Sequence, residues 1–316
     1  MRKPGGILWA LIALVVAALL SPMTASTAGE QGIGGKAVAA ASAGSTHATN
    51  DAAGARDSEF KAEPFQNRVV TFNVCNPCRW PDKGSDPAMH IRQIAEQIKT
   101  YRPQVVALQE ICVGETERLA ELLDFRYGLD YNIAHGSVTN RTGRCYPYGK
   151  AYGNAILSAA PLTNKVNHIY GQGGSEPRGY VAADTTLNGK TYRILATHLA
   201  EAGQSAVRTG QVRELVAEAT KYPDVIVLGD FNSQPNGAEL APMWESFRDA
   251  DPHCTPQSTT NCQMTIGDQG KPNGRKFDYI WQRKGYTQPG VGVHNNYSDH
   301  HLVHADIPKP CIPINC

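Results

Sequence analysis

Runs of β-branched and apolar residues alternate along this chain with amphipathic segments, and this alternation restricts the fold most strongly. Residues 180–187 and 191–199 flank Asn188 and Gly189, a dipeptide that favours a two-residue turn between antiparallel strands. Parallel neighbours need a longer crossover, so a doubly wound parallel sheet is disfavoured. We predict a layered α/β domain with mixed sheets and with helices on the outside.

Further elements are expected where β-branched residues cluster or where apolar residues recur with a helical period. Asp86 before Pro87 is typical of a helix start. Other helices are expected at residues 115–125 and 205–221. The remaining strands are expected at residues 68–75, 105–111, 154–158, 225–228, 276–282 and 302–307.

The N-terminus has the pattern of a secretory signal peptide. Arg2 and Lys3 precede an unbroken apolar run at residues 7–20, and Ser26 and Ala28 suit a cleavage site. The run is shorter than the roughly 20 apolar residues that a spanning helix needs. We therefore expect a secreted, extracellular protein without stable membrane insertion.

The chain divides into three segments by composition. Residues 1–28 form the expected signal peptide. Residues 29–65 are rich in Ala, Gly, Ser and Thr and lack an apolar period, so we expect a disordered linker there. Residues 66–316 then form the folded domain.

All eight cysteines lie beyond the expected signal peptide, and an even number in an exported chain indicates disulfides. A zinc or redox site at residues 75–78 is the rival interpretation, which the absence of a second C-x-x-C motif disfavours. Short spacing favours the pairs Cys254–Cys262 and Cys311–Cys316. The other four cysteines pair either as Cys75–Cys78 with Cys112–Cys145, or crossed.

Several predicted strands end in polar residues that an apolar core disfavours. Ligand sites gather at strand ends in α/β folds. Carboxylates that converge there repel one another unless a cation lies among them. The oxygen donors suit Mg²⁺ or another hard divalent cation rather than a thiolate zinc site. The residues are Asn73, Glu110, His198, Asp230, Asn232, Asp278, Asp299 and His300.

The segments around these residues resemble a known superfamily. They are, in chain order, VVTFNV, VVALQEI, GNAILS, ATHL, VIVLGDFNS, FDYIW and YSDHHLV. This series is similar to the endonuclease/exonuclease/phosphatase superfamily, which includes DNase I, exonuclease III and bacterial sphingomyelinases. The resemblance covers residues 67–308. It implies a four-layer α/β sandwich, with two packed mixed β-sheets flanked by helices, and metal-dependent phosphodiester hydrolysis in the 66–316 catalytic domain.

The resemblance also implies a metal site. Glu110 would be the principal ligand, with Asn73 and Asp299 nearby. Mg²⁺ is the expected cofactor, Mn²⁺ is the alternative, and Ca²⁺ could assist. A divalent cation offsets the negative charge that grows on a phosphodiester under attack.

Catalytic roles follow from the same resemblance. Asp230 and Asn232 would position or deprotonate the attacking water and hold the phosphate. His198 and His300 would bind the scissile phosphate and transfer protons, and Asp278 would orient His300.

The substrate-binding candidates are Arg144, Tyr152, Asn154 and Lys276. The formal net charge is only +1, so attraction to phosphate must come from local groups. Basic side chains pair with phosphates, and aromatic rings stack on bases. We expect a monomeric secreted endonuclease that acts on DNA ahead of RNA.

Three alternatives remain: a sphingomyelinase or phospholipase C-type phosphodiesterase, a phosphatase of small phosphoesters, and an inactive binding module. Residues 170–180 offer no Trp and no apolar tip, which disfavours membrane entry. Cys112 occupies a position where DNase I-like sequences usually have Arg, which argues against their manner of minor-groove contact. The complete set of site residues argues against an inactive module.

Overall fold

The computed structural model describes residues 63–75, 86–139, 145, 147–149, 151–257, 259–267, 274–284, 290–294 and 298–308, all within one compact unit, Ala55–Cys316. The predicted signal peptide and residues 29–62 of the predicted linker lie outside the described residues. The first strand, β1 (Phe65–Asn73), begins one residue before the predicted domain start.

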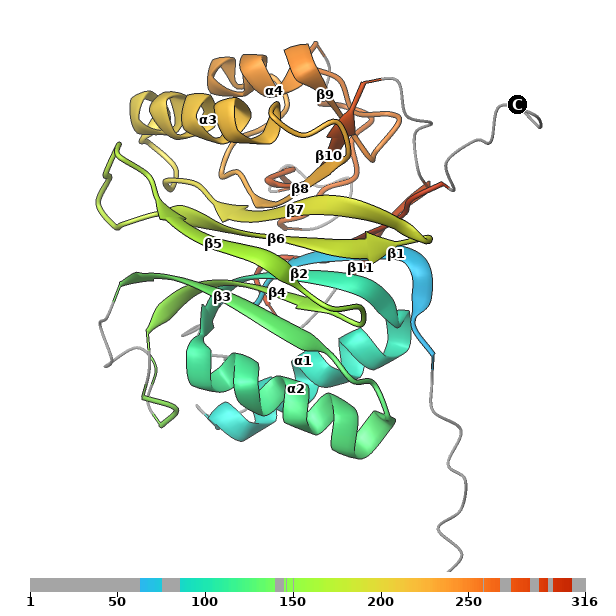
Figure 1. Ribbon diagram of the computed structural model, residues 1–316. Helices are drawn as coiled ribbons and strands as arrows, with labels where there is room; N and C mark the ends of the chain where they lie inside the picture. The colour runs from blue at the N-terminus through green and yellow to red at the C-terminus, as the bar shows by residue number, and fades with distance from the viewer. Residues whose placement is uncertain are drawn as a thin grey trace, which may run out of the picture. The chain divides into compact units, whose positions relative to one another are not determined.

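Two six-stranded sheets form the centre of the unit (Figure 1). Among the strand pairs of the described residues, β1–β2 and β7–β8 are parallel and the others are antiparallel. In spatial order, the first sheet contains β11 (Gly290–His294), β12 (Leu302–Asp306), β1, β2 (Pro103–Cys112), β4 (Tyr152–Ser158) and β3 (Asn132–Thr139). The second contains β5 (Thr163–Ile169), β6 (Gly179–Leu187), β7 (Lys190–His198), β8 (Val225–Asp230), β10 (Asp278–Arg283) and β9 (Phe247–Asp249).

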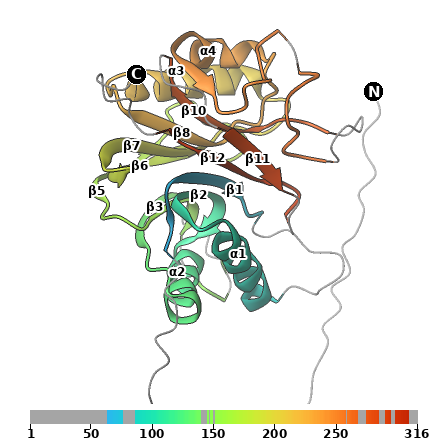
Figure 2. The same ribbon diagram turned by 90° about the vertical axis from the view of Figure 1, so that its right-hand side faces the viewer.

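Helices cover the outer face of each sheet (Figures 1 and 2). Apolar residues of α1 (Pro87–Tyr101) and α2 (Val113–Tyr127) pack on the first sheet. Those of α3 (Ser205–Ala219) and α4 (Ala241–Ser246) pack on the second. A third cluster fills the space between the sheets. The predicted four-layer α/β sandwich is therefore confirmed.

Alternation along the strands separates these layers. In β8, Ile226 and Leu228 belong to the cluster between the sheets, whereas Val225 and Val227 belong to the cluster beneath α3. This period of two is the geometry of an extended strand buried on both faces. Every buried strand therefore has one side-chain series that points toward the opposite sheet.

The predicted hairpin is present between β6 and β7. Asn188 and Gly189 adopt positive φ values of 52° and 76°, which a tight hairpin turn of this kind requires. Strands β3, β5, β9 and β11 were not predicted from the sequence. Most of β5 is exposed, so its residues show no apolar alternation that would reveal a strand.

Two disulfides lie within the described residues, Cys112–Cys145 and Cys254–Cys262. The crossed alternative for Cys112 is therefore excluded. Cys75 also forms a disulfide, but Cys78, Cys311 and Cys316 lie outside the described residues. Among the helices that are described, none is both long and apolar enough to cross a membrane.

Close packing of β3 against β4 generates a stability prediction. A Cβ atom added to Gly153 would lie 2.0 Å from the carbonyl oxygen of Gly136, whereas one added to Gly173 would meet nothing within 4 Å. We expect Gly153→Ala to destabilise the fold by about 1–3 kcal/mol because the two backbones must separate. Thermal unfolding should show a lowered Tm for Gly153→Ala and no change for Gly173→Ala. An equal Tm for the two variants would contradict this account.

Candidate active site

Three polar side chains form one row across the second sheet. His198 is in register with Asp230, and Asp230 is in register with Asp278. Each belongs to the side-chain series that points toward the first sheet, because each lies two residues from a residue of the inter-sheet cluster on its own strand. The three are 3%, 1% and 0% exposed. The apolar layer between the sheets therefore ends in a buried polar row.

The first sheet contributes Asn73 and Glu110 opposite this row. The Asn73 Nδ2 atom donates to Glu110 Oε1 at 3.2 Å and to Asp230 Oδ2 at 3.1 Å. Glu110 has φ of 58°, and the β2–β4 register shifts between Leu108 and Ile111. Strict alternation would place Glu110 with Leu108 beneath the helices. With a left-handed backbone at this position, the Glu110 side chain contacts Asn73 instead.

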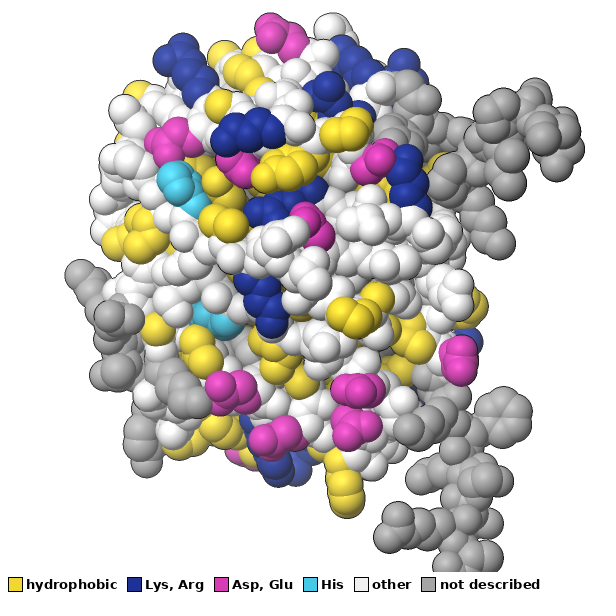
Figure 3. All heavy atoms as spheres, viewed as in Figure 1, with side chains coloured by type: hydrophobic (Ala, Val, Ile, Leu, Met, Phe, Trp, Pro, Cys, Tyr) yellow, Lys and Arg dark blue, Asp and Glu magenta, His cyan; other side chains and the backbone are white. Residues whose placement is uncertain are grey.

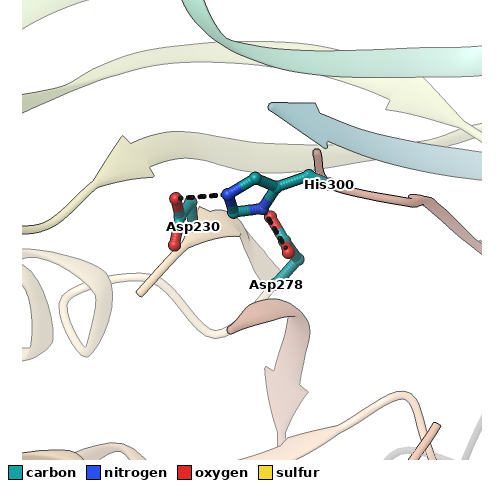
Figure 4. A group of neighbouring side chains, drawn as sticks. All are labelled: Asp230, Asp278 and His300. Atoms are coloured by element: carbon teal, nitrogen blue, oxygen red, sulfur yellow. Dashed lines mark hydrogen bonds and ion pairs between the residues drawn. The ribbon is translucent and has the colours of Figure 1, made fainter. Parts of the chain in front are cut away.

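His300 links the two aspartates of the row (Figure 4). Its Nδ1 atom lies 2.8 Å from Asp278 Oδ2, and its Nε2 atom lies 3.6 Å from Asp230 Oδ2. The loop before His300 is held by Ser298, whose hydroxyl donates to the Asn73 carbonyl and accepts from the His300 amide. The imidazole is thus placed between two carboxylates that approach it from opposite sides.

The neighbouring charges determine the protonation of His300 and Asp230. Burial disfavours a charge on His300, but Asp278 and Asp230 outweigh it and raise the pKa of His300 to about 10. Burial alone would raise the pKa of Asp230, yet the charge of His300 and the hydrogen bonds from His198 and the Asn232 amide hold that pKa below its ordinary value. Because its folded-state pKa is raised, His300 contributes stability fully below its ordinary pKa of 6.5. That contribution is lost as pH rises through about 10.

His198 completes the row from β7. Its Nε2 atom lies 3.2 Å from Asp230 Oδ2 and 3.0 Å from Asn232 Nδ2. The Asn232 backbone amide donates to Asp230 Oδ1 at 2.8 Å, and its φ of 49° turns the chain back toward His198. On the other side of the ring, Arg178 Nη1 lies 3.3 Å from His198 Nδ1. Arg178 is not among the residues predicted from the sequence; its signal there is a charged residue immediately before a buried strand.

The oxygen donors of the first sheet fit a hard divalent cation. Glu110 and Asp230 approach the same amide nitrogen of Asn73, and two carboxylates this close together favour a nearby positive charge. Asp299 is exposed beside His300. The ligating atoms of Asp230, Asp278 and His300 also lie within 4.8 Å of one another. A hydrogen bond from His300 to Asp278 and an ion pair between His300 and Asp230 already link that trio, so Glu110, Asn73 and Asp299 are the better candidates for holding a metal.

The predicted substrate-binding residues require correction. Arg144 lies outside the described residues. Tyr152 is 1% exposed and packs around the Cys112–Cys145 disulfide. The buried Asn154 amide donates to the carbonyl oxygen of Gly179. Tyr152 and Asn154 therefore contact other parts of the protein, and the role of Arg144 in substrate binding stays a prediction.

Lys276 also differs from the prediction. It is 1% exposed, and its ammonium lies 2.9 Å from Asp249 Oδ2. Asp249, Asp251 and Cys254 form a second group with metal-ligating atoms, but Cys254 is in a disulfide and Asp249 is paired with Lys276. Neither Lys276 nor this group is available to a substrate or a metal.

Comparisons with known proteins agree with this geometry. The family model described as "Endonuclease/Exonuclease/phosphatase family" matches residues 70–300. The uncharacterized protein YbhP of Escherichia coli is 25% identical over 197 residues, which cover 54% of this chain and 69% of YbhP. Sphingomyelinase C of Listeria ivanovii is 26% identical over 159 residues, which cover 43% of this chain and 47% of that protein.

A solved structure shows the same fold. The structure of D. rerio TDP2 complexed with single-strand DNA product superposes with a TM-score of 0.52 at 20% identity, covering 75% of this chain and 97% of that chain. The family match spans the strands that position Asn73, Glu110, His198, Asp230 and Asp278, and it ends at His300. The chain belongs to the endonuclease/exonuclease/phosphatase family, whose members are hydrolases of phosphoester bonds.

Proposed function

We propose that this protein is a secreted, Mg²⁺-dependent phosphodiesterase that cleaves DNA. The observation that supports it most directly is the buried chain Asp278–His300–Asp230, which faces Asn73 and Glu110 across the inter-sheet layer. This chain combines a protonated imidazole with an ionised carboxylate in one small volume. Both groups can assist the hydrolysis of an anionic ester, one by stabilising developing negative charge and the other by accepting a proton from water.

The charges of His300 and Asp230 give these two residues different roles. Protonated His300 donates from Nε2 to a phosphate oxygen, which stabilises the charge that develops during attack. Ionised Asp230, oriented by Asn73 and by the Asn232 amide, accepts a hydrogen bond from the attacking water. Asp278 holds the His300 ring in place. A divalent cation held by Glu110, with Asn73 and Asp299, would supply further positive charge to the phosphate.

Features outside the active site favour DNA over a lipid. Residues 171–177, which lead to Arg178, are polar and exposed except for Glu176, so they offer no apolar tip for membrane entry. Basic and acidic side chains are interspersed on the face drawn in Figure 3, with acidic ones close together over the layer of α2. Affinity for a phosphodiester on that face must therefore come from local groups. The TDP2 structure contains a DNA product on the same fold.

Sphingomyelin is the second candidate substrate. It is favoured by the 26% identity to Sphingomyelinase C of Listeria ivanovii, a relative named for hydrolysis of sphingomyelin. Both substrates contain a phosphodiester, so the site chemistry does not separate them. Because segment 171–177 offers no apolar tip, we rank the lipid second.

Secretion is part of the proposal. The signal-peptide pattern of residues 1–28 supports it, as do the Cys112–Cys145 and Cys254–Cys262 disulfides, because disulfides persist in oxidising compartments.

A substrate panel tests the proposal directly. Plasmid DNA, RNA, sphingomyelin vesicles and a chromogenic phosphodiester are offered to the purified protein with Mg²⁺, with Mn²⁺, and with excess chelator. We expect nicking of plasmid DNA with either metal and loss of activity in chelator, restored by adding Mg²⁺. Hydrolysis of sphingomyelin alone would establish the second candidate, and full activity in chelator would exclude a metal-dependent reaction.

Glu110→Gln tests the expected metal ligand. Removing this carboxylate charge should lower kcat for the preferred substrate about 100-fold or more, because compensation of phosphate charge is lost. The control is Glu121→Gln, an exposed change on α2 that breaks only a surface pair with Arg118. Activity and Tm are measured together. Loss of activity in step with loss of folding, or equal activity in the two variants, would count against the assignment.

Asp278→Asn tests the protonation of His300. Asp278 helps to raise the pKa of His300 to about 10, so its neutral replacement should lower that pKa. Activity that needs protonated His300 should then decline at a lower pH on the alkaline side of the profile. The kcat profile from pH 6 to 10 is compared with that of Asp124→Asn, an exposed substitution on α2. An alkaline limb that does not move would refute this role for Asp278.

A further inference from the structure

Arg178 is buried behind the active-site row, immediately before β6. It is 6% exposed, and its Nη1 atom lies 3.1 Å from Glu176 Oε2 and 3.3 Å from His198 Nδ1. The adjacent residue, Gly179, accepts a hydrogen bond from Asn154 of the first sheet. The guanidinium is therefore held between a carboxylate and an imidazole, with its backbone tied to the opposite sheet.

The other side of the His198 ring faces two different groups. Asp230 Oδ2 lies 3.2 Å from Nε2 and can only accept when ionised. Asn232 Nδ2 lies 3.0 Å from Nε2 and also donates to the Leu199 carbonyl at 3.2 Å. That second bond requires the nitrogen of the Asn232 amide, and not its oxygen, on the side toward His198.

Only one protonation state of His198 suits most of these neighbours. With a proton on Nε2 alone, Nδ1 accepts from Arg178 and Nε2 donates to Asp230, and only the Asn232 nitrogen is mismatched. With a proton on Nδ1 alone, the Nδ1–H group faces the Arg178 guanidinium, which can only donate. The Nε2 lone pair then faces the Asp230 carboxylate, which can only accept. With both protons, the charged ring faces the guanidinium, which cannot accept.

We propose that Arg178 is a positioning residue that holds neutral His198 in the Nε2–H tautomer. The two histidines of the site are then oriented in opposite senses. His300 donates from Nδ1 to Asp278, whereas His198 accepts at Nδ1 from Arg178. A carboxylate behind the His300 ring and a guanidinium behind the His198 ring give the two rings different protonation states.

This tautomer determines what His198 does in the reaction. Its Nε2–H group donates to Asp230 in the free protein and is available to donate to a phosphate oxygen when substrate is bound. His198 is then a neutral hydrogen-bond donor and does not take up the proton of the attacking water. This consequence rests on the proposed function, whereas the tautomer itself does not.

Long-range ¹H–¹⁵N NMR of the histidine rings tests the tautomer without substrate or metal. The full-length, ¹⁵N-labelled protein is used near pH 7.5, and His198 is assigned by comparison with His198→Gln. We expect the pattern of a neutral ring protonated at Nε2. A wild-type ring protonated at Nδ1, whether neutral or charged, overturns the proposal.

Two variants test whether Arg178 is responsible. Arg178→Met removes the donor, so the tautomer ratio should move toward Nδ1–H and kcat should fall about tenfold or more. Arg178→Lys keeps a cationic donor and should retain both the Nε2–H pattern and most of kcat. An unchanged His198 spectrum in folded Arg178→Met would overturn the proposal. Loss of the Nε2–H pattern in folded Arg178→Lys would overturn it as well. Absence of hydrolysis by the wild type would reject the proposed function while leaving the wild-type tautomer result to decide this inference.

Discussion

Asp230 is the buried charge around which the other site residues are arranged. Its Oδ2 atom is approached by Asn73 at 3.1 Å, by His198 at 3.2 Å and by His300 at 3.6 Å. An isolated carboxylate in such a position would cost several kcal/mol, so these neighbours are required for it to remain ionised. Because Asn73 belongs to the first sheet and Asp230 to the second, the same compensation also joins the two sheets at the site.

The surroundings of the two histidines show how one fold obtains different chemistry from the same side chain. Asp278 behind His300 favours the imidazolium, and its partner Asp230 lies on the other side of the ring. Arg178 behind His198 favours a lone pair at Nδ1. The difference comes from neighbouring charge and not from burial, since both rings are almost fully buried. Proton transfer and hydrogen-bond donation can thus be divided between two residues of one type.

The substrate-binding predictions show where inference from sequence fails. Tyr152 and Lys276 have the side chains expected of a phosphodiester-binding surface, yet both are buried, one beside a disulfide and the other against Asp249. Residue type does not show which way a side chain faces when its partner lies far along the chain. Asn154 belongs to a family segment, but its amide supports Gly179, 25 positions away.

The sequence alone determined the layered fold and most of the site. Strands with a period of two place Asn73, His198, Asp230 and Asp278 in the same side-chain series as inter-sheet core residues, so their convergence follows from parity and strand order. Only the tertiary structure decided the direction of Glu110, because a left-handed backbone at a register shift overrides that parity. It also decided the contact of Arg178 with His198, because packing between β6 and β7 brings a guanidinium to a ring that lies 20 residues further along the chain.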